Sequence, residues 1–116
     1  MHRNVVLAVG LQKEDLLCLL DSMEPMGCQV ISALSLQDAG WIAGHRTIRL
    51  IILDMERLRP DGAQAFQDTV EQNPSMPILI LHGEGRTWLS RLKSTVCFQR
   101  DARIQDVISV AASLLR

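Results

Sequence analysis

The stretch IRLIILDMERLRPDG, residues 48–62, decides the fold of this chain and poses its main chemical question. It begins as an apolar run and stops on one carboxylate, Asp54. A short apolar run without alternation, bounded by turn residues, is typical of a strand that is covered on both faces. Burying an unpaired carboxylate is costly. We therefore expect Asp54 to lie at the rim where the strand leaves the core, ionised and solvated.

Apolar runs recur along the whole chain and alternate with segments of helical spacing. The expected strands are residues 4–10, 28–33, 48–54, 77–83 and 95–98, and the expected helices are residues 12–26, 36–44, 62–72, 84–93 and 103–115. Gly27 ends the first helix, and Asp61 is the expected N-cap of the third. Trp41, on the second helix, is expected to pack inside. The third helix should bury Ala65, Phe66, Thr69 and Val70.

Strands that alternate with helices through the whole chain predict an α/β fold with a parallel sheet. The commonest five-stranded arrangement has the strand order 2-1-3-4-5 with helices on both faces. Its functional cleft lies at the carboxyl ends of strands 1 and 3, and Asp54 falls at that edge. We expect a single domain over residues 1–116, with this sheet and five helices.

Charge and composition exclude several classes of function. The net charge is −1 and the basic residues are spread along the chain, so direct binding of nucleic acid is not expected. No apolar run approaches the roughly 18 residues of a transmembrane helix, and the N-terminus has no secretory signal pattern. Three cysteines without CxxC spacing indicate reduced thiols in a reducing compartment. We expect a cytoplasmic protein without membrane partners.

Over essentially its whole length, the chain resembles a response-regulator receiver domain of the chemotaxis type, a flavodoxin-like fold. The resemblance rests on the order of the elements, on LLDSMEPMGCQVISA and MPILILHG, and above all on LIILDMERLRPDG. In that family the third strand ends in a phospho-accepting aspartate, and an Asp-Gly pair opens the third helix. Asp54 and the pair Asp61-Gly62 match these positions. The resemblance implies a regulatory domain of a bacterial two-component system that is not an enzyme.

The positions that bind Mg²⁺ in the family are altered in this chain. Receiver domains hold the metal with the phospho-accepting aspartate and a pair of acidic residues after the first strand, where this chain has Gly10 and Leu11. Glu14 and Asp15 could fill the pair only if the strand ran on through Lys13, which would cost the first helix its opening turn. We reject that register and expect the acidic pair to be absent.

Two further positions differ from the family's pattern at the ends of the fourth and fifth strands. His82 stands where the family has a Ser or Thr that bonds the phosphoryl group, and it is a candidate switch or a polar strand cap. Arg100 is the one candidate for the positive charge that a Lys supplies in the family. Mg²⁺ needs hard oxygen ligands. With Asp54 as the only carboxylate of the expected cluster, and only Glu56 nearby to compensate, we predict no metal site and no cofactor.

We therefore interpret the chain as a degenerate receiver domain, a pseudo-receiver, that acts through protein contacts independently of phosphorylation. The expected partners are a second copy, a kinase-like protein or an attached output domain such as a transcription factor. Candidate dimer contacts, on the family's dimer face, are Trp88, Leu89 and Leu92. Two alternatives stay open. One is a phospho-acceptor receiver, in which Mg²⁺ assists phosphorylation of Asp54, and the other is a small-ligand sensor in the cleft at the strand ends.

Overall fold

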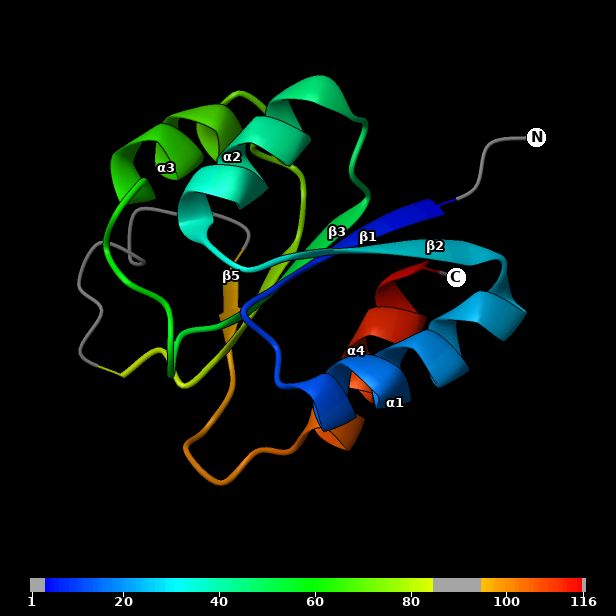
Figure 1. The fold of residues 1–116 in the computed structure, drawn as a ribbon. Coiled ribbons are helices and arrows are strands. Elements are labelled where there is room, and N and C mark those ends of the chain that lie inside the picture. The colour runs from blue at the N-terminus through cyan, green and yellow to red at the C-terminus, as the bar shows by residue number, and fades with distance from the viewer. Residues whose placement is uncertain (1–3, 85–94, 116) are drawn as a thin grey trace.

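The computed structural model describes residues 4–84 and 95–115 and shows a parallel sheet between two layers of helices (Figure 1). The strands are β1 Asn4–Val9, β2 Cys28–Ala33, β3 Leu50–Asp54, β4 Ile78–Leu81 and β5 Thr95–Cys97. The helices are α1 Lys13–Met23, the 3-10 helix η1 Glu24–Met26, α2 Leu36–His45, α3 Ala63–Glu71 and α4 Ile104–Leu115. No helix within the described ranges is long and apolar enough to cross a bilayer.

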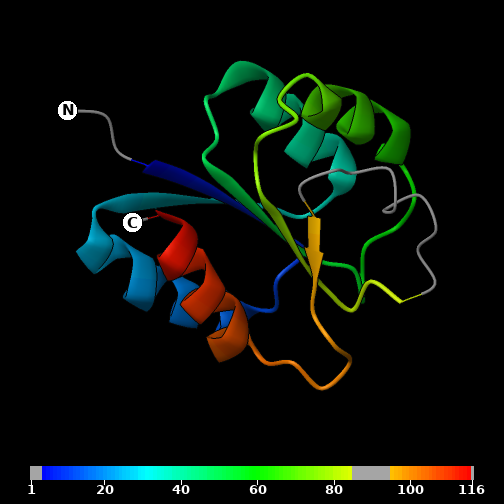
Figure 2. The same cartoon turned by 180° about the vertical axis from the view of Figure 1, so that it is seen from behind.

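The sheet has the order β2-β1-β3-β4-β5 with every neighbouring pair parallel, as the sequence predicts. Helices α1 and α4 cover one face, and α2 and α3 cover the other (Figures 1 and 2). Successive side chains of a strand point to opposite faces. Leu53 accordingly packs in the core on the α2/α3 side, while Leu50 and Ile52 pack on the α1/α4 side. The even-numbered positions of β3, and hence Asp54, face α1 and α4.

The expected first helix is divided into two parts. Helix α1 ends at Met23, and the short helix η1 follows over Glu24–Met26. Pro25 lies in the first turn of η1, where its missing N–H prevents a further α-helical hydrogen bond. Gly27 then adopts a left-handed φ of 80° and ends the helix, as predicted. The expected helix over residues 84–93 falls on residues 85–94, which lie outside the described part of the chain, and four α-helices lie within it.

The predicted start of α3 is wrong by one residue. Part of its predicted buried face is also wrong. The N-cap is Gly62, with a φ of 80°, and no side chain caps the helix. A Cβ at Gly62 would lie 2.7 Å from the backbone of Gln37, so the close approach of α2 demands glycine there and leaves Asp61 outside the helix. Phe66 and Val70 are buried as predicted, but Ala65 is exposed and Gln67 is buried in its place.

The prediction that Trp41 packs inside is also wrong. Its side chain is 66% exposed and stacks on the ring of His45, four residues further along α2, with ring centroids 4.3 Å apart. The buried face of α2 is made of Leu36, Ala39 and Gly40 instead. Small residues there let α2 approach α3 closely, since a Cβ at Gly40 would lie 3.2 Å from a backbone atom of α3. The helical spacing alone gave no sign of this close approach.

Candidate functional site

Asp54 is the last residue of β3, at the carboxyl edge of the sheet, and it is buried. Its pairing partner in β4 is Leu81, and the N–H of Met55 donates to the carbonyl of Leu81 at 2.9 Å. The ladder between β3 and β4 therefore continues one residue beyond Asp54, so the chain has not yet left the core there. The residue is 2% exposed. This corrects the expectation that Asp54 is solvated at the rim.

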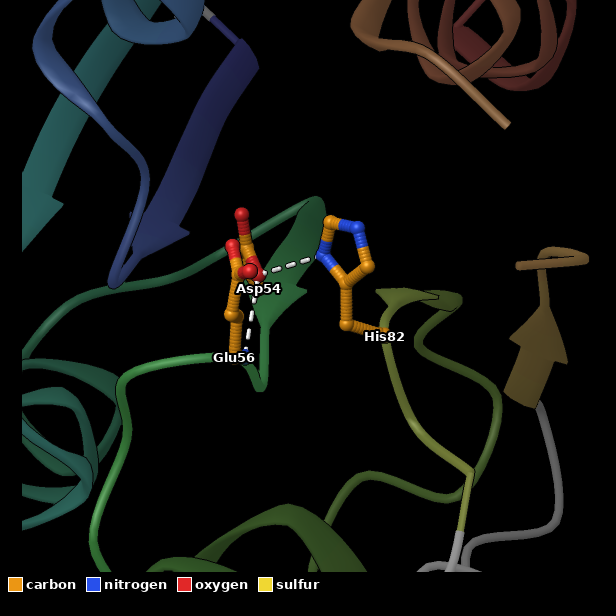
Figure 3. Close-up of side chains that lie close together, drawn as sticks. All are labelled: Asp54, Glu56 and His82. Atoms are coloured by element: carbon orange, nitrogen blue, oxygen red, sulfur yellow. Dashed lines mark hydrogen bonds and ion pairs between the residues drawn. The ribbon is translucent and has the colours of Figure 1, made fainter. Parts of the chain in front are cut away.

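His82 supplies the polar partner that a buried carboxylate requires. It directly follows β4, and its Nδ1 lies 2.8 Å from Oδ1 of Asp54 (Figure 3). An ionised carboxylate only accepts hydrogen bonds, so Nδ1–H is the donor. The backbone of His82 has a φ of 57°, which is uncommon for a residue other than glycine. The imidazole is 34% exposed, and its second nitrogen points away from the carboxylates (Figure 3).

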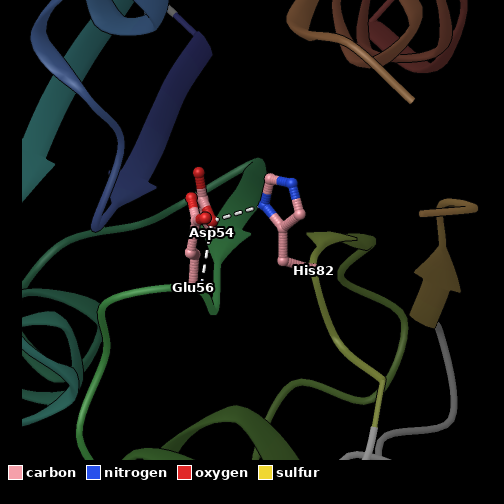
Figure 4. Close-up of polar contacts among 3 residues, drawn as sticks. All are labelled: Asp54, Glu56 and His82. Atoms are coloured by element: carbon pink, nitrogen blue, oxygen red, sulfur yellow. Dashed lines mark hydrogen bonds and ion pairs between the residues drawn. The ribbon is translucent and has the colours of Figure 1, made fainter. Parts of the chain in front are cut away.

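Glu56 completes a cluster of three ligand-bearing side chains. Its backbone N–H donates to the same Oδ1 of Asp54 at 3.1 Å (Figure 4). Its carboxylate is exposed and lies beside that of Asp54 (Figure 4). One ligand atom from each of Asp54, Glu56 and His82 lies within 4.8 Å of the others. The structure thus brings Asp54, His82 and the compensating candidate Glu56 together at one edge.

The charges around this cluster shift two pKa values. The hydrogen bond that His82 donates to Asp54 raises the pKa of His82 above its ordinary value, partial burial opposes this, and the negative charges of Asp54, Glu56 and Glu84 raise it further. Partial burial raises the pKa of Asp15, and the charges of Asp54 and Glu14 add to the rise, while His82 lowers it. Asp15 therefore lies within the electrostatic field of Asp54 and His82.

Asp15 is a charged neighbour of the site whose position the sequence did not predict. Strand β1 ends at Val9 and α1 begins at Lys13, so the alternative register for Glu14 and Asp15 is correctly rejected. Asp15 instead lies in the first turn of α1, which covers the face of the sheet on which Asp54 lies, and from there it senses the charges of Asp54 and His82. The sequence feature that could have predicted this is the position of Asp15 in the first turn of a helix that starts at the carboxyl edge of the sheet.

The position of the family's acidic pair is filled by backbone and apolar packing. Gly10 has a φ of 74°, and a Cβ built on it would lie 2.9 Å from both the carbonyl oxygen of Asp54 and Cγ of Leu58. Leu11 packs partly buried against the core on the α1/α4 side. An acidic side chain at Gly10 would therefore require both a strained backbone and displacement of Leu58. The backbone conformation and packing of this loop, and not only its side chains, are therefore unsuited to an acidic pair.

Mg²⁺, which the resemblance implies, does not fit these residues. The ion needs near-octahedral oxygen coordination, commonly from one or two carboxylates with several waters. The three ligands brought together are two carboxylates and an imidazole nitrogen, which is a poor ligand for this hard ion. At the first position of the acidic pair, Gly10, any side chain would clash with Leu58 and with the backbone of Asp54. We therefore assign no Mg²⁺ to this cluster.

The remaining sequence-predicted site residues do not join the cluster. Arg100 is exposed in the turn after β5, and within residues 4–84 and 95–115 the one ion pair joins His82 to Asp54. The predicted dimer contacts, Trp88, Leu89 and Leu92, lie outside the described residues. An open groove of about 490 Å³ lies elsewhere, between the end of β2 and α2. It is lined by Ser32, Ala33, Leu34, Asp38, Trp41 and Ile42.

Solved structures similar to this one include response-regulator receiver domains. The chain is 20% identical to a response regulator receiver protein from Sinorhizobium medicae, with a TM-score of 0.74 over 98% of this chain and 95% of that one. It is 18% identical to the signal receiver domain of an HD domain-containing protein from Pseudomonas fluorescens, with a TM-score of 0.73 and coverage of 98% and 95%.

A longer protein also contains the fold. The chain is 21% identical to NtrX from Brucella abortus, with a TM-score of 0.68. The matched region covers 98% of this chain but only 27% of NtrX. No model of a known protein family matches the sequence, and no curated protein matches it either. The fold is therefore that of response-regulator receiver domains, and the departures at the site belong to this chain.

Proposed function

We propose that this chain is a receiver-like regulatory domain that acts through protein partners without phosphorylation of Asp54. The observation that carries the proposal is the state of the Asp54 carboxylate. It is 2% exposed, and its Oδ1 is held by His82 at 2.8 Å and by the N–H of Glu56 at 3.1 Å. Both contacts fix the orientation of the carboxylate through Oδ1, and its burial limits the approach of a phosphodonor.

The electrostatics of phosphoryl transfer support the proposal. The reaction brings anions together, and catalysis depends on a metal and on cationic donors that neutralise the transferring group. The cluster instead holds the carboxylates of Asp54 and Glu56, with Asp15 in the same field. Gly10 leaves no room for an acidic Mg²⁺ ligand. A residue able to accept a phosphoryl group is thus present, but the groups that assist the transfer are not assembled around it.

The proposed role is regulatory and not enzymatic, with a protein as the partner. Receiver folds occur both in short proteins and within longer chains, as the coverage of 95% and 27% in two solved structures illustrates. We propose a second copy, an output domain such as a transcription factor, or a kinase-like protein as the partner, in the cytoplasm. The dimer is tested by sedimentation of the wild type and of the Trp88→Ala, Leu92→Ala double variant. An unaltered monomer in both proteins removes dimerisation from the proposal.

The test of phosphorylation independence is intact mass after incubation with a small acyl phosphate and Mg²⁺. We expect no gain of a phosphoryl group by the wild type. A stoichiometric gain that disappears in Asp54→Asn contradicts the proposal and establishes the second candidate, a phospho-acceptor with an altered site. The observation favouring that candidate is the place of Asp54 at the end of β3 with a second carboxylate, that of Glu56, beside it.

A third candidate is a small-ligand sensor at the carboxyl edge of the sheet. It is favoured by the meeting of Gly10, Asp54 and His82 at this edge. Ligand binding to the native state raises the apparent stability. Thermal unfolding with and without nucleotides tests it, and a shift that His82→Gln abolishes would support a sensor. An unchanged unfolding temperature with every nucleotide counts against it.

A further inference from the structure

The cluster of Asp54, Glu56 and His82 has the composition of a site for a different class of metal ion. Its ligand atoms come from two carboxylates and one imidazole, all within 4.8 Å of one another. Figure 3 shows the two carboxylates side by side, with Nδ1 of His82 facing them. We propose that these three side chains bind one divalent transition-metal ion, of which Zn²⁺ is the representative.

The spacing of the ligand atoms suits a single ion. Nitrogen and oxygen ligands lie about 2.1 Å from Zn²⁺, so two neighbouring ligands of a tetrahedral ion are about 3.4 Å apart. Nδ1 of His82 and Oδ1 of Asp54 are 2.8 Å apart, so a small outward movement of the partly exposed imidazole places both at ligand distance once the proton between them is lost. The exposed side chain of Glu56 is able to close the remaining distance by rotation. Three protein ligands leave a fourth position that water fills.

The charge balance of the site also calls for a cation. Asp54 is buried, and within the described ranges its second oxygen, Oδ2, has no hydrogen-bond partner. Its only ion-pair partner there is His82, and no Lys or Arg of the described residues joins it. Glu56 adds a second negative charge, and Asp15 lies in the electrostatic field of Asp54. A divalent ion neutralises the two ligand carboxylates, whereas a protonated imidazole neutralises only one of them.

Ligand chemistry selects the class of ion. Imidazole nitrogen suits Zn²⁺ and its transition-metal neighbours, whereas Mg²⁺ and Ca²⁺ favour sites made of oxygen alone. On binding, Nδ1 of His82 gives up its proton: an imidazolium releases it to solvent, whereas a neutral ring changes to the Nε2–H tautomer, and the Nδ1 lone pair then coordinates the ion. Asp54 and Glu56 bind as carboxylates. No bond other than this N–H bond is broken, and no oxidation takes place.

Calorimetric titration of Zn²⁺ into the 116-residue chain tests this proposal. We expect one ion per chain, and we expect Glu56→Gln and His82→Gln each to weaken binding by about tenfold or more. Co²⁺ provides a spectroscopic check, because its visible absorption reports coordination by nitrogen and oxygen. Mg²⁺ in large excess should not displace either ion. A wild type that binds no Zn²⁺, or two variants that bind as the wild type does, overturns the proposal.

Matched controls separate this site from other metal-binding side chains. The triple variant His2→Gln, His45→Gln, Cys97→Ser removes the other histidines and the exposed thiol while leaving the cluster intact. It should bind one Zn²⁺ with unchanged affinity, and loss of binding in this variant contradicts the assignment. Glu56→Gln changes only an exposed side chain, so it is expected to fold even if His82→Gln is unstable. The titration contains no phosphodonor, so its outcome is independent of the proposed function.

Discussion

Nδ1 of His82 lies 2.8 Å from Oδ1 of Asp54, and this contact joins the carboxyl ends of two neighbouring parallel strands. Asp54 ends β3, and His82 follows β4. Because Asp54 is 2% exposed, the imidazole is the group that offsets the cost of burying its carboxylate. This contact engages the carboxylate at the phospho-acceptor position and raises the pKa of His82.

Stability should depend on pH through His82 when a chelator keeps metal away. The pKa of His82 is raised in the folded protein, first by its hydrogen bond to Asp54. A raised pKa contributes stability that is fully present below the unfolded-state value of about 6.5 and is lost as pH rises through the folded-state value. We expect the free energy of unfolding, measured with urea, to fall over this range in the wild type.

The matched control for this prediction is His82→Gln, which removes the titration and keeps a polar side chain. The carboxylates of Asp15, Glu56 and Glu84, which share the field, remain in both proteins. The difference in unfolding free energy between wild type and variant should therefore shrink as the pH rises. A difference that is the same at both ends of the range would show that the ion pair contributes nothing to folding.

The fold was largely predictable because β1, β3 and β4 are short, continuous apolar runs that alternate with helical segments, a pattern typical of a parallel sheet covered on both faces. The errors lie where two helices approach each other. Trp41 has helical spacing with core residues, but Gly40 faces α3 in its place. Asp61 is a good N-cap by residue type, but only Gly62 fits against Gln37. The distance between two packed helices cannot be predicted from the residue pattern of a single sequence.

Two glycines of α2 offer a matched test of that close approach. Gly44→Ala should stabilise the protein by about 0.5 to 1 kcal/mol, since alanine favours the helix and its Cβ meets only Thr69 at 3.8 Å. Gly40→Ala should lose this gain or destabilise, because its Cβ would meet the backbone of Phe66 at 3.2 Å. Urea unfolding of both variants checks this. Equal stabilisation by the two substitutions would mean that the helices do not pack so closely.

Gly10 should tolerate substitution less well than Gly27. Both have left-handed backbone conformations, with φ of 74° and 80°, and alanine costs about 1 to 2 kcal/mol in such a conformation. A Cβ at Gly27 meets nothing within 4 Å, whereas one at Gly10 meets Asp54 and Leu58 at 2.9 Å. We expect Gly10→Ala to cost about 1 to 3 kcal/mol more than Gly27→Ala, as overpacking does. Similar losses in the two variants would contradict the close packing of Gly10 on β3.

Restoring an acidic pair should not restore a working receiver site. In the Gly10→Asp, Leu11→Asp double variant, the first substitution clashes with Leu58 and the second places a carboxylate where Leu11 packs against the core. We expect a larger loss of stability than in Gly10→Ala, and no Mg²⁺-dependent phosphorylation. Thermal unfolding and intact mass measure the two effects. A stable double variant that gains a phosphoryl group would show that only side chains, and not the loop backbone, were lost.

The candidate site was only partly predictable. The meeting of Asp54 and His82 at one edge follows from the strand order, because both end neighbouring strands. The burial of Asp54 does not, since it depends on the ladder continuing through Met55 to Leu81. The part played by Asp15 depends on the face of the sheet that α1 covers, which the sequence pattern leaves open.

The central claim, that Asp54 is not a phospho-acceptor, is tested most directly by intact mass spectrometry. Wild type, Asp54→Asn and His82→Ala are incubated with a small acyl phosphate and Mg²⁺ until a working receiver domain in a parallel reaction is fully modified. We expect an unchanged mass for the wild type and for Asp54→Asn. A gain of one phosphoryl group by the wild type, absent in Asp54→Asn, would contradict it. A gain only in His82→Ala would show that the contact of His82 with Asp54 is what blocks the reaction.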